Sequence, residues 1–322
     1  MSDYTIRPLE GEDDYSFGVE LFNACFSEYT DLNYNIYQLR DWWKVGDDPV
    51  REVYIVEVDE QPLAALRFTQ FPGEEGKLRF YCNVNIMPDD YSFSLLRELF
   101  MEMLERVTEH KPDELRMSLF GHQEEYMALV EAQGFKRIQR DQLSSLVLSN
   151  LDFDSFADIV QHVKESGIRL VTLAEYKQEN RQYKTALVEL NNAIYEDVPG
   201  FESTVTTLEQ FETRVLQNKD VLDDTWILAM DDEQLVGMTY NARFGNDEDC
   251  LTQLTGVIRS HRRRGITTAM KLRSFVILRD MGFKRILTGN EENNPMYQIN
   301  LKLGFRPGPA MFLYTKQLSG ER

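Results

Sequence analysis

The chain has 322 residues, a length that suits two domains of about 150 residues each better than one compact domain. Its 42% hydrophobic and 28% charged residues are typical of a globular protein and exclude a disordered one. The formal net charge of −19 argues against a nucleic-acid-binding protein, which presents a basic face. Three scattered cysteines without a CxxC pair indicate neither a disulfide framework nor a zinc ribbon, so no metal site is expected.

The sequence also bears on where the protein works. Its N-terminus, MSDYTIRPLEGEDD, is acidic and polar, which is not typical of a signal peptide. No apolar run reaches the roughly 18 residues that a membrane helix needs. We therefore expect no membrane association and a cytoplasmic location.

The predicted elements occur twice in the same order. The first half contains a strand at 5–9, a hairpin at 52–70, an amphipathic helix at about 91–110, a strand at 114–119 and a helix–Gly–Phe element at 125–138. The second half contains a strand at 167–171, a hairpin at 224–242, a helix at about 265–281 that Gly282 ends, a strand at 285–289 and a helix–Gly–Phe element at 295–308. Strands followed by helices in this order indicate an α/β (α+β) fold.

Nearly constant offsets separate the matching residues of the two halves. The matched pairs are Gln61 and Gln234 (173 apart), Leu115 and Ile286 (171 apart), and Gly134 and Gly304 (170 apart). Any two α+β domains share some of this order, but recurrence of the hairpin and the helix–Gly–Phe element favours two copies of one domain. The predicted domains are 1–150 and 165–322, with a polar connector or short helix between them.

The stretch HRRRGITTAM, residues 261–270, concentrates positive charge in an acidic chain. A strand is predicted before it at 250–258, and a helix is predicted to begin at about Gly265. A helix N-terminus exposes free N–H groups and the positive end of the helix dipole, which suits a diphosphate. The stretch has neither the GKS or GKT of a P-loop nor the three glycines of a dinucleotide fingerprint. The alternative is a solvated turn with incidental charge.

Two motifs in the second half resemble those of the GNAT superfamily of N-acetyltransferases. RRRGIT (262–267) is similar to the family's R/Q-x-x-G-x-G/A loop, with Thr267 where Gly or Ala is usual. TGNEENNPMYQINLKLGF (288–305) resembles the second signature, in which an Asn precedes a helix that closes on Gly-Phe. The resemblance covers 168–322 well and 1–150 by architecture alone. Tandem GNAT proteins with one intact half are a known arrangement, of which mycothiol synthase is an example.

The resemblance implies two GNAT-like domains, each a mixed, mostly antiparallel sheet flanked by helices. It implies that the second domain binds acetyl-CoA as co-substrate, with the loop and helix start around its diphosphate and the end of the preceding strand beside its pantetheine arm. The residues implied to bind acetyl-CoA are Val257, Arg259, Arg262, Arg263, Arg264, Gly265, Ile266, Thr267, Thr268 and Asn293.

The first half lacks this loop. At the matching place it has PDDYSFSLLREL (88–99), without the R-x-x-G-x-G/A pattern. Asp89 and Asp90 would repel a diphosphate at close range. We therefore interpret 1–150 as a degenerate domain that supports or shapes the substrate site.

Catalytic residues are harder to assign. Many family members carry a tyrosine four residues before the Gly-Phe that protonates the leaving thiolate, and this chain has Asn300 there. Asn300 can donate a hydrogen bond but is no acid, so Tyr297, one turn earlier on the helix, is the substitute candidate. The acidic residues that the sequence offers as a base are Asp249, Glu291 and Glu292.

The leading hypothesis is an acetyl-CoA-dependent N-acetyltransferase with one working site, in the second domain. Its acceptor is expected to be a small-molecule or side-chain amine, and the acidic balance favours a cationic one, such as a polyamine, an aminoglycoside or a lysine side chain. Asn300 favours the alternative, a catalytically weak acyl-CoA-binding or regulatory protein. Transfer to a hydroxyl is a third hypothesis.

Overall fold

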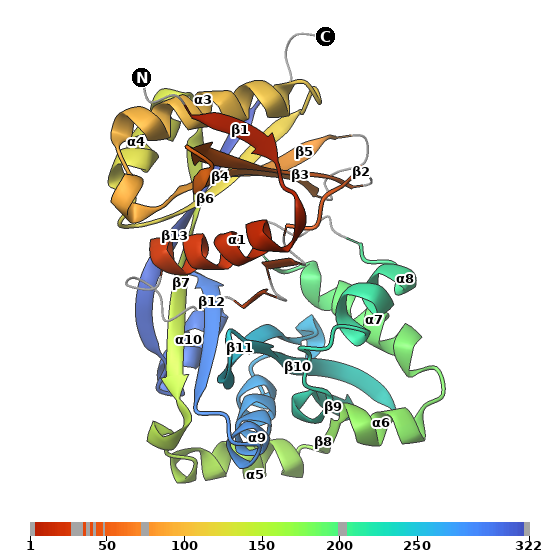
Figure 1. Ribbon diagram of the computed structural model, residues 1–322. Coiled ribbons are helices and arrows are strands. Elements are labelled where there is room, and N and C mark those ends of the chain that lie inside the picture. Colours follow the sequence, from red (N-terminus) through yellow and green to blue (C-terminus); the bar gives the residue numbers. More distant parts are fainter. Residues whose placement is uncertain are drawn as a thin grey trace. The chain divides into compact units, whose positions relative to one another are not determined.

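The computed structural model describes residues 4–26, 35–36, 39–40, 43–47, 49–71, 77–198 and 205–318 (Figure 1). The chain folds into two compact units. Unit 1 comprises 1–142 and 308–322, and unit 2 comprises 143–307. Within the described residues, no helix is long and apolar enough to cross a lipid bilayer.

Unit 1 contains a mixed, mostly antiparallel sheet. Its strands, in spatial order, are β1 (Thr5–Pro8), β3 (Val50–Val58), β4 (Gln61–Phe71), β5 (Arg79–Ile86), β6 (Glu114–Phe120) and β13 (Arg306–Gln317), and the short β2 (Gly46–Asp47) pairs with β3. Neighbouring strands are antiparallel except β5 and β6, which are parallel. The predicted hairpin is β3–β4, and its turn residues Asp59 and Glu60 have positive φ, as a tight hairpin turn requires.

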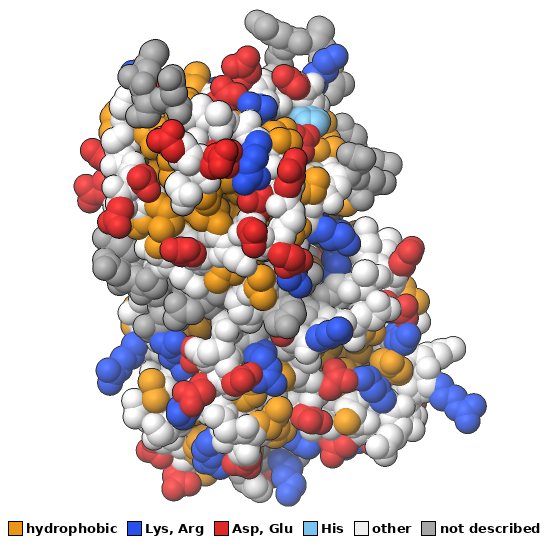
Figure 2. Space-filling view, viewed as in Figure 1, with side chains coloured by type: hydrophobic (Ala, Val, Ile, Leu, Met, Phe, Trp, Pro, Cys, Tyr) orange, Lys and Arg blue, Asp and Glu red, His pale blue; other side chains and the backbone are white. Residues whose placement is uncertain are grey.

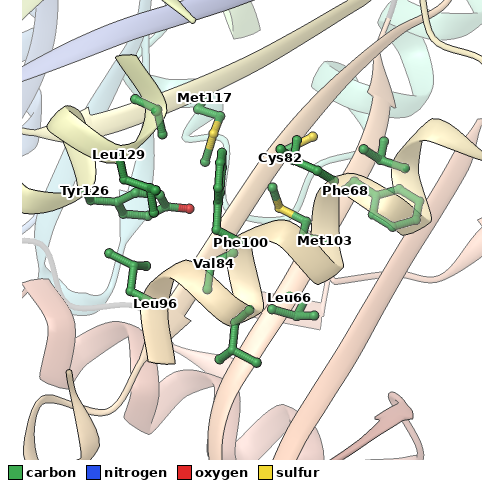
Figure 3. Close-up of a cluster of buried hydrophobic side chains, with 14 of the residues drawn as sticks. Leu66, Phe68, Cys82, Val84, Leu96, Phe100, Met103, Met117, Tyr126 and Leu129 are labelled. Carbon is green, nitrogen blue, oxygen red and sulfur yellow. The ribbon is translucent and has the colours of Figure 1, made fainter. Parts of the chain in front are cut away.

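Helices cover both faces of this sheet. The helices are α1 (Gly11–Phe26), α3 (Phe93–Thr108) and α4 (Glu124–Ala132), with a 3-10 turn at Pro88–Asp90. Alternate residues of β4 face opposite sides, so Leu66 and Phe68 pack under α3 and α4 while Ala65 packs with α1. Figure 3 shows the first of these cores, where Phe100 and Tyr126 from the two helices meet edge to face with ring centroids 5.8 Å apart.

Unit 2 repeats the plan. Its strands, in spatial order, are β12 (Arg285–Glu291), β11 (Asn246–Val257), β10 (Gln234–Phe244), β9 (Ile227–Asp231) and β8 (Ile168–Thr172). They are antiparallel except for the parallel pair β11–β12. The second predicted hairpin is therefore present as β9–β10.

The α-helices of unit 2 are α5 (Ala157–Glu165), α6 (Leu173–Glu179), α7 (Tyr183–Tyr195), α8 (Leu208–Phe211), α9 (Ile266–Asp280) and α10 (Pro295–Lys302). Short 3-10 turns lie at Leu148–Asn150, Asp154–Phe156, Asp223–Thr225 and Arg259–His261, and a π-helical segment lies at Glu212–Leu216. The connector predicted between the domains includes α5. Helix α9 ends as predicted, because Gly282 has φ +93° and the N–H groups of Gly282 and Phe283 bond to Arg279 and Leu278.

The matched residues occupy equivalent places in the two units. Gln61 and Gln234 begin β4 and β10, and Leu115 and Ile286 are the second residues of β6 and β12. Gly134 and Gly304 follow α4 and α10 with φ of +85° and +90°. The fold class predicted from the sequence is confirmed.

The compact units differ from the predicted domain ranges 1–150 and 165–322 at two strands. Strand β7 (Lys136–Val147) begins in unit 1 and ends in unit 2, and β13 begins in unit 2 and ends in unit 1. Strand β13 ends in unit 1 because its residues Met311 to Gln317 pair with β6. Sequence periodicity specifies that a strand exists but not which neighbour it pairs with.

Candidate functional site

Two parallel strands separate in the middle of unit 2. The register pairs β11 with β12 at Asp249–Arg285, Cys250–Ile286 and Leu251–Leu287, and pairing then stops. Both strands continue, β11 to Val257 and β12 to Glu291, while β11 remains paired with β10 on its other side. The facing backbone edges beyond Leu251 and Leu287 are therefore available to an extended ligand that carries amide groups.

The basic loop begins where β11 ends. After Val257 the chain makes the short turn Arg259–His261, and α9 starts at Ile266. Arg263 has φ +63° and Gly265 has φ +79°, so left-handed residues alternate along the loop. Such alternation turns successive N–H groups toward one side and forms an anion-binding concavity.

Backbone N–H groups at the end of this loop are free of acceptors within the described residues. The first helical bond runs from the N–H of Ala269 to the carbonyl of Gly265, and no described side chain caps the helix. Within the described part of the chain, the N–H groups from Arg263 to Thr268 have no hydrogen-bond partner. Together with the positive end of the α9 dipole, these donors suit a diphosphate.

Gly265 is required for a reason that the sequence did not show. From the sequence, glycine was expected to leave room for phosphate beside the backbone. In the structure, a Cβ at Gly265 would lie 2.9 Å from Cγ2 of Ile159 and 3.4 Å from Cγ2 of Val163, both on α5. Crowding therefore comes from the protein's own helix, and the positive φ adds conformational strain for any side chain.

Two of the predicted arginines share one carboxylate. Asp197, just after α7, accepts hydrogen bonds from Arg259 at 2.6–3.0 Å and from Arg262. The bonds from Arg259 first, and then those from Arg262, lower the pKa of Asp197 to about 2. Arg262 also donates from Nε to the carbonyl of Val257 at 2.9 Å, so one acceptor of the backbone segment predicted to lie beside the pantetheine arm is already engaged.

The other basic groups of the loop differ in their partners. His261 Nε2 lies 2.9 Å from Asp231 Oδ2, and Arg264 NH1 lies 3.8 Å from the same oxygen. Arg263 is exposed and has no ion pair with any residue that the structure describes. Thr267 and Thr268 are half-buried in the first turn of α9.

Asp197→Asn is expected to tighten acetyl-CoA binding about 3- to 10-fold at low salt, because it frees two guanidinium groups for the diphosphate at an exposed site. The gain should shrink as salt rises. Calorimetric titration at two ionic strengths measures both effects, with the exposed Asp224→Asn as matched control. Weaker binding in Asp197→Asn would mean that the carboxylate holds the arginines in their binding positions.

The second signature surrounds the start of α10. Asn293 is exposed, and its side chain donates to Glu291 Oε1 at 2.8 Å. Tyr297 is half-buried in the first turn of the helix, and its hydroxyl has no hydrogen-bond partner in the described ranges. Asn300 is fully buried and donates to Asn290 Oδ1 at 2.6 Å, so it faces β12. Among the described residues, no hydrogen bond joins these three side chains to the basic loop.

Two of the three candidate bases are engaged in hydrogen bonds within the protein. Asp249 is buried and bonded to Arg285 and Asn246, which makes it a structural carboxylate. Glu291 accepts both the backbone and side-chain N–H groups of Asn293. Glu292 is exposed.

The matching loop of unit 1 caps itself. Ser92 accepts a hydrogen bond from the N–H of Leu95 at 3.2 Å, and the N–H groups of Asp90 and Tyr91 bond within the loop. Asp89 and Asp90 are exposed at the same helix start. This loop therefore offers fewer free donors and the wrong charge for a diphosphate.

Sequence reasoning missed one buried cation of unit 2. Lys271 on α9 is fully buried, and its Nζ has no hydrogen-bond partner within the described ranges. Burial lowers its pKa to about 7, against a smaller opposing effect of Cys250. Spacing could have revealed it, since Phe275 and Leu278 lie four and seven residues further along the same face.

No protein-family model and no curated protein sequence matches the chain. Solved structures match over its whole length, and they show that the chain has the fold of tandem GCN5-related N-acetyltransferases. One is a tandem GNAT protein from the clavulanic acid biosynthesis pathway, at 21% identity and TM-score 0.75, with 99% of this chain and 100% of that chain covered.

Two further structures resemble the chain to the same degree. A GCN5-related N-acetyltransferase from Sphaerobacter thermophilus has 15% identity and TM-score 0.74, with 99% and 97% of the two chains covered. A glucosamine N-acetyltransferase region of a fungal multi-domain β-N-acetylglucosaminidase has 9% identity and TM-score 0.75, with 98% of this chain and 38% of that chain covered. At these identities the likeness concerns the fold.

Proposed function

We propose that the protein is an acetyl-CoA-dependent N-acetyltransferase whose working site lies in unit 2. The observation that carries the proposal is the run of free N–H groups from Arg263 to Thr268, at a helix start directly after a strand that separates from its neighbour. These donors would hold the diphosphate. The free edges of β11 and β12 would take the amides of the pantetheine arm.

Electrostatics support the same ligand and acceptor. The loop gathers Arg262, Arg263 and Arg264 in a chain of net charge −19. On the face shown in Figure 2, carboxylates are interspersed with basic side chains. An anionic co-substrate would be held by the loop, and the net negative charge of the chain would favour a cationic amine acceptor.

In the proposed reaction, the neutral amine of the acceptor attacks the thioester carbonyl of acetyl-CoA. A C–N bond forms, the C–S bond breaks, and the amine proton leaves to a base or to water. Tyr297 would protonate the thiolate, since its hydroxyl has no hydrogen-bond partner among the described residues and it lies on α10, which packs beside β12. Asn300 would position β12 through Asn290 and would not transfer a proton.

Release of free thiol from acetyl-CoA, measured against a panel of polyamines, aminoglycosides and lysine peptides, tests the proposed function. Acetylation of at least one amine by mass spectrometry is the expected result. Tight acetyl-CoA binding without transfer to any amine would favour the second candidate, an acyl-CoA-binding regulatory protein. The observation behind that candidate is Asn300, a buried non-acid at the position where the family resemblance implies a tyrosine.

Tyr297→Phe is expected to lower kcat about 100-fold with little effect on acetyl-CoA affinity, because the hydroxyl would act only as the thiolate forms. Steady-state kinetics and calorimetry separate the two effects. The control is Tyr183→Phe, which removes a hydroxyl from the start of α7 in the same unit. If kcat stays unchanged in Tyr297→Phe, solvent protonates the thiolate.

A further inference from the structure

An apolar groove of about 610 Å³ lies between α5, β8 and α9 in unit 2. Its floor consists of side chains that are at least 95% buried: Val163, Ile168, Ala269 and Leu272. Val160, which is 41% exposed, lies at its edge on α5. The volume is within the range of small-molecule sites, which are apolar with a few polar groups that fix orientation.

The charge of the groove opposes that of the protein. Lys164, Arg169 and Arg273 line it, and none of the described lining residues is a carboxylate, although the chain has 54 acidic residues against 35 basic ones. Arg169 and Arg273 pair outside the groove with Glu179 at 2.7 Å and Glu175 at 3.2 Å. Lys164 is exposed, and no residue that the structure describes forms a salt bridge with it.

We propose that this groove binds a free fatty acid. The aliphatic chain would cover the floor formed by Val163, Ile168 and Leu272, and the carboxylate would pair with Lys164. The lysine stem adds apolar contact while its ammonium reaches the headgroup. A cationic amphiphile would be repelled by Lys164, and a neutral one would gain no charge attraction from it.

The groove and the basic loop use different parts of α9. Ala269, Leu272 and Arg273 face the groove, whereas the free N–H groups of the loop end at Thr268. Fatty-acid binding therefore does not depend on the proposed acetyl transfer. A negative result for fatty-acid binding would not contradict the proposed acetyl transfer, and a negative result for acetyl transfer would not contradict fatty-acid binding.

The first test is calorimetric titration of the full chain with dodecanoate below its micelle concentration. One site per chain is expected, with affinity at least 10-fold higher than for dodecanol or dodecyltrimethylammonium. Equal affinity for the three compounds would contradict recognition of a carboxylate. Binding to phosphatidylglycerol vesicles without binding of dodecanoate would also overturn the proposal.

Variants place the site. Lys164→Glu reverses the charge that faces the fatty-acid carboxylate, and Val160→Glu puts a carboxylate at the groove edge. Each variant should therefore weaken dodecanoate binding at least 10-fold. Lys136→Glu and Val205→Glu make the same changes at exposed positions outside the groove and should leave dodecanoate binding unchanged. Circular dichroism checks folding of each variant.

Two outcomes would overturn this location. One is unchanged dodecanoate binding in both groove variants. The other is a dimer of the parent chain in light scattering that Val160→Glu dissociates, with no dodecanoate bound, since a second copy would then cover the groove.

Discussion

Gly265→Val should reduce acetyl-CoA binding at least 100-fold while both units remain folded. Valine disfavours φ +79°, and its Cβ would lie 2.9 Å from Cγ2 of Ile159, so the start of α9 has to shift. Because the free N–H groups from Arg263 to Thr268 share one loop conformation, a shift would misalign them together. Calorimetry with acetyl-CoA measures the loss.

The matched control is Gly282→Val at the other end of α9. Gly282 has φ +93°, but a Cβ there has no atom within 4 Å. This variant carries the same kind of strain, about 1–3 kcal/mol of destabilisation, away from the loop. Its acetyl-CoA affinity should equal that of the parent. Parental affinity in Gly265→Val would show that the loop is only a charged turn.

Lys271→Met should raise the free energy of unfolding of unit 2 by about 2–4 kcal/mol at pH 6, because it removes a buried ammonium that lies over the rings of Phe275 and Phe305 but has no hydrogen-bond partner among the described residues. Methionine fills similar space without the charge. Equilibrium urea unfolding followed by tryptophan fluorescence measures the change, with Trp226 buried in unit 2 as reporter.

The sign of the pH dependence follows from the lowered pKa of Lys271. The pKa is about 7 in the folded protein and 10.5 as the ordinary value, so the unfolded chain binds more protons between these limits. Parental stability should therefore rise with pH from about 7 to 10.5, and the advantage of Lys271→Met should shrink over the same window. Exposed Lys302→Met should show no such trend. Destabilisation by Lys271→Met at pH 6 would contradict this account of the buried amine.

Local pattern sufficed to predict most of the fold. Apolar, β-rich runs on either side of acidic turn residues predicted the hairpins β3–β4 and β9–β10, and a glycine after an apolar helix predicted the end of α9 at Gly282. These features depend on neighbours within a few residues of each other. The pairing of β13 with β6 joins strands almost 200 residues apart, and no local pattern encodes it.

In the candidate site, too, local features could be predicted from the sequence and long-range contacts could not. The motif at 262–267 specified a loop before a helix, and the structure has that loop with its free N–H groups. Its partners come from elsewhere: Asp197 lies 62 and 65 residues from Arg259 and Arg262, and Ile159 reaches Gly265 from α5. Such contacts depend on tertiary packing, so the sequence could neither show the shared carboxylate nor the true neighbour of the glycine.

Amide hydrogen exchange with and without acetyl-CoA tests the central claim most directly. The N–H groups from Arg263 to Thr268 lack acceptors in the structure and should exchange fast in the free protein. Acetyl-CoA should slow exchange of this segment strongly and leave the matching unit 1 segment, 88–96, unchanged. Protection confined to 88–96, or none at 263–268 with acetyl-CoA bound, would contradict a diphosphate site at the start of α9.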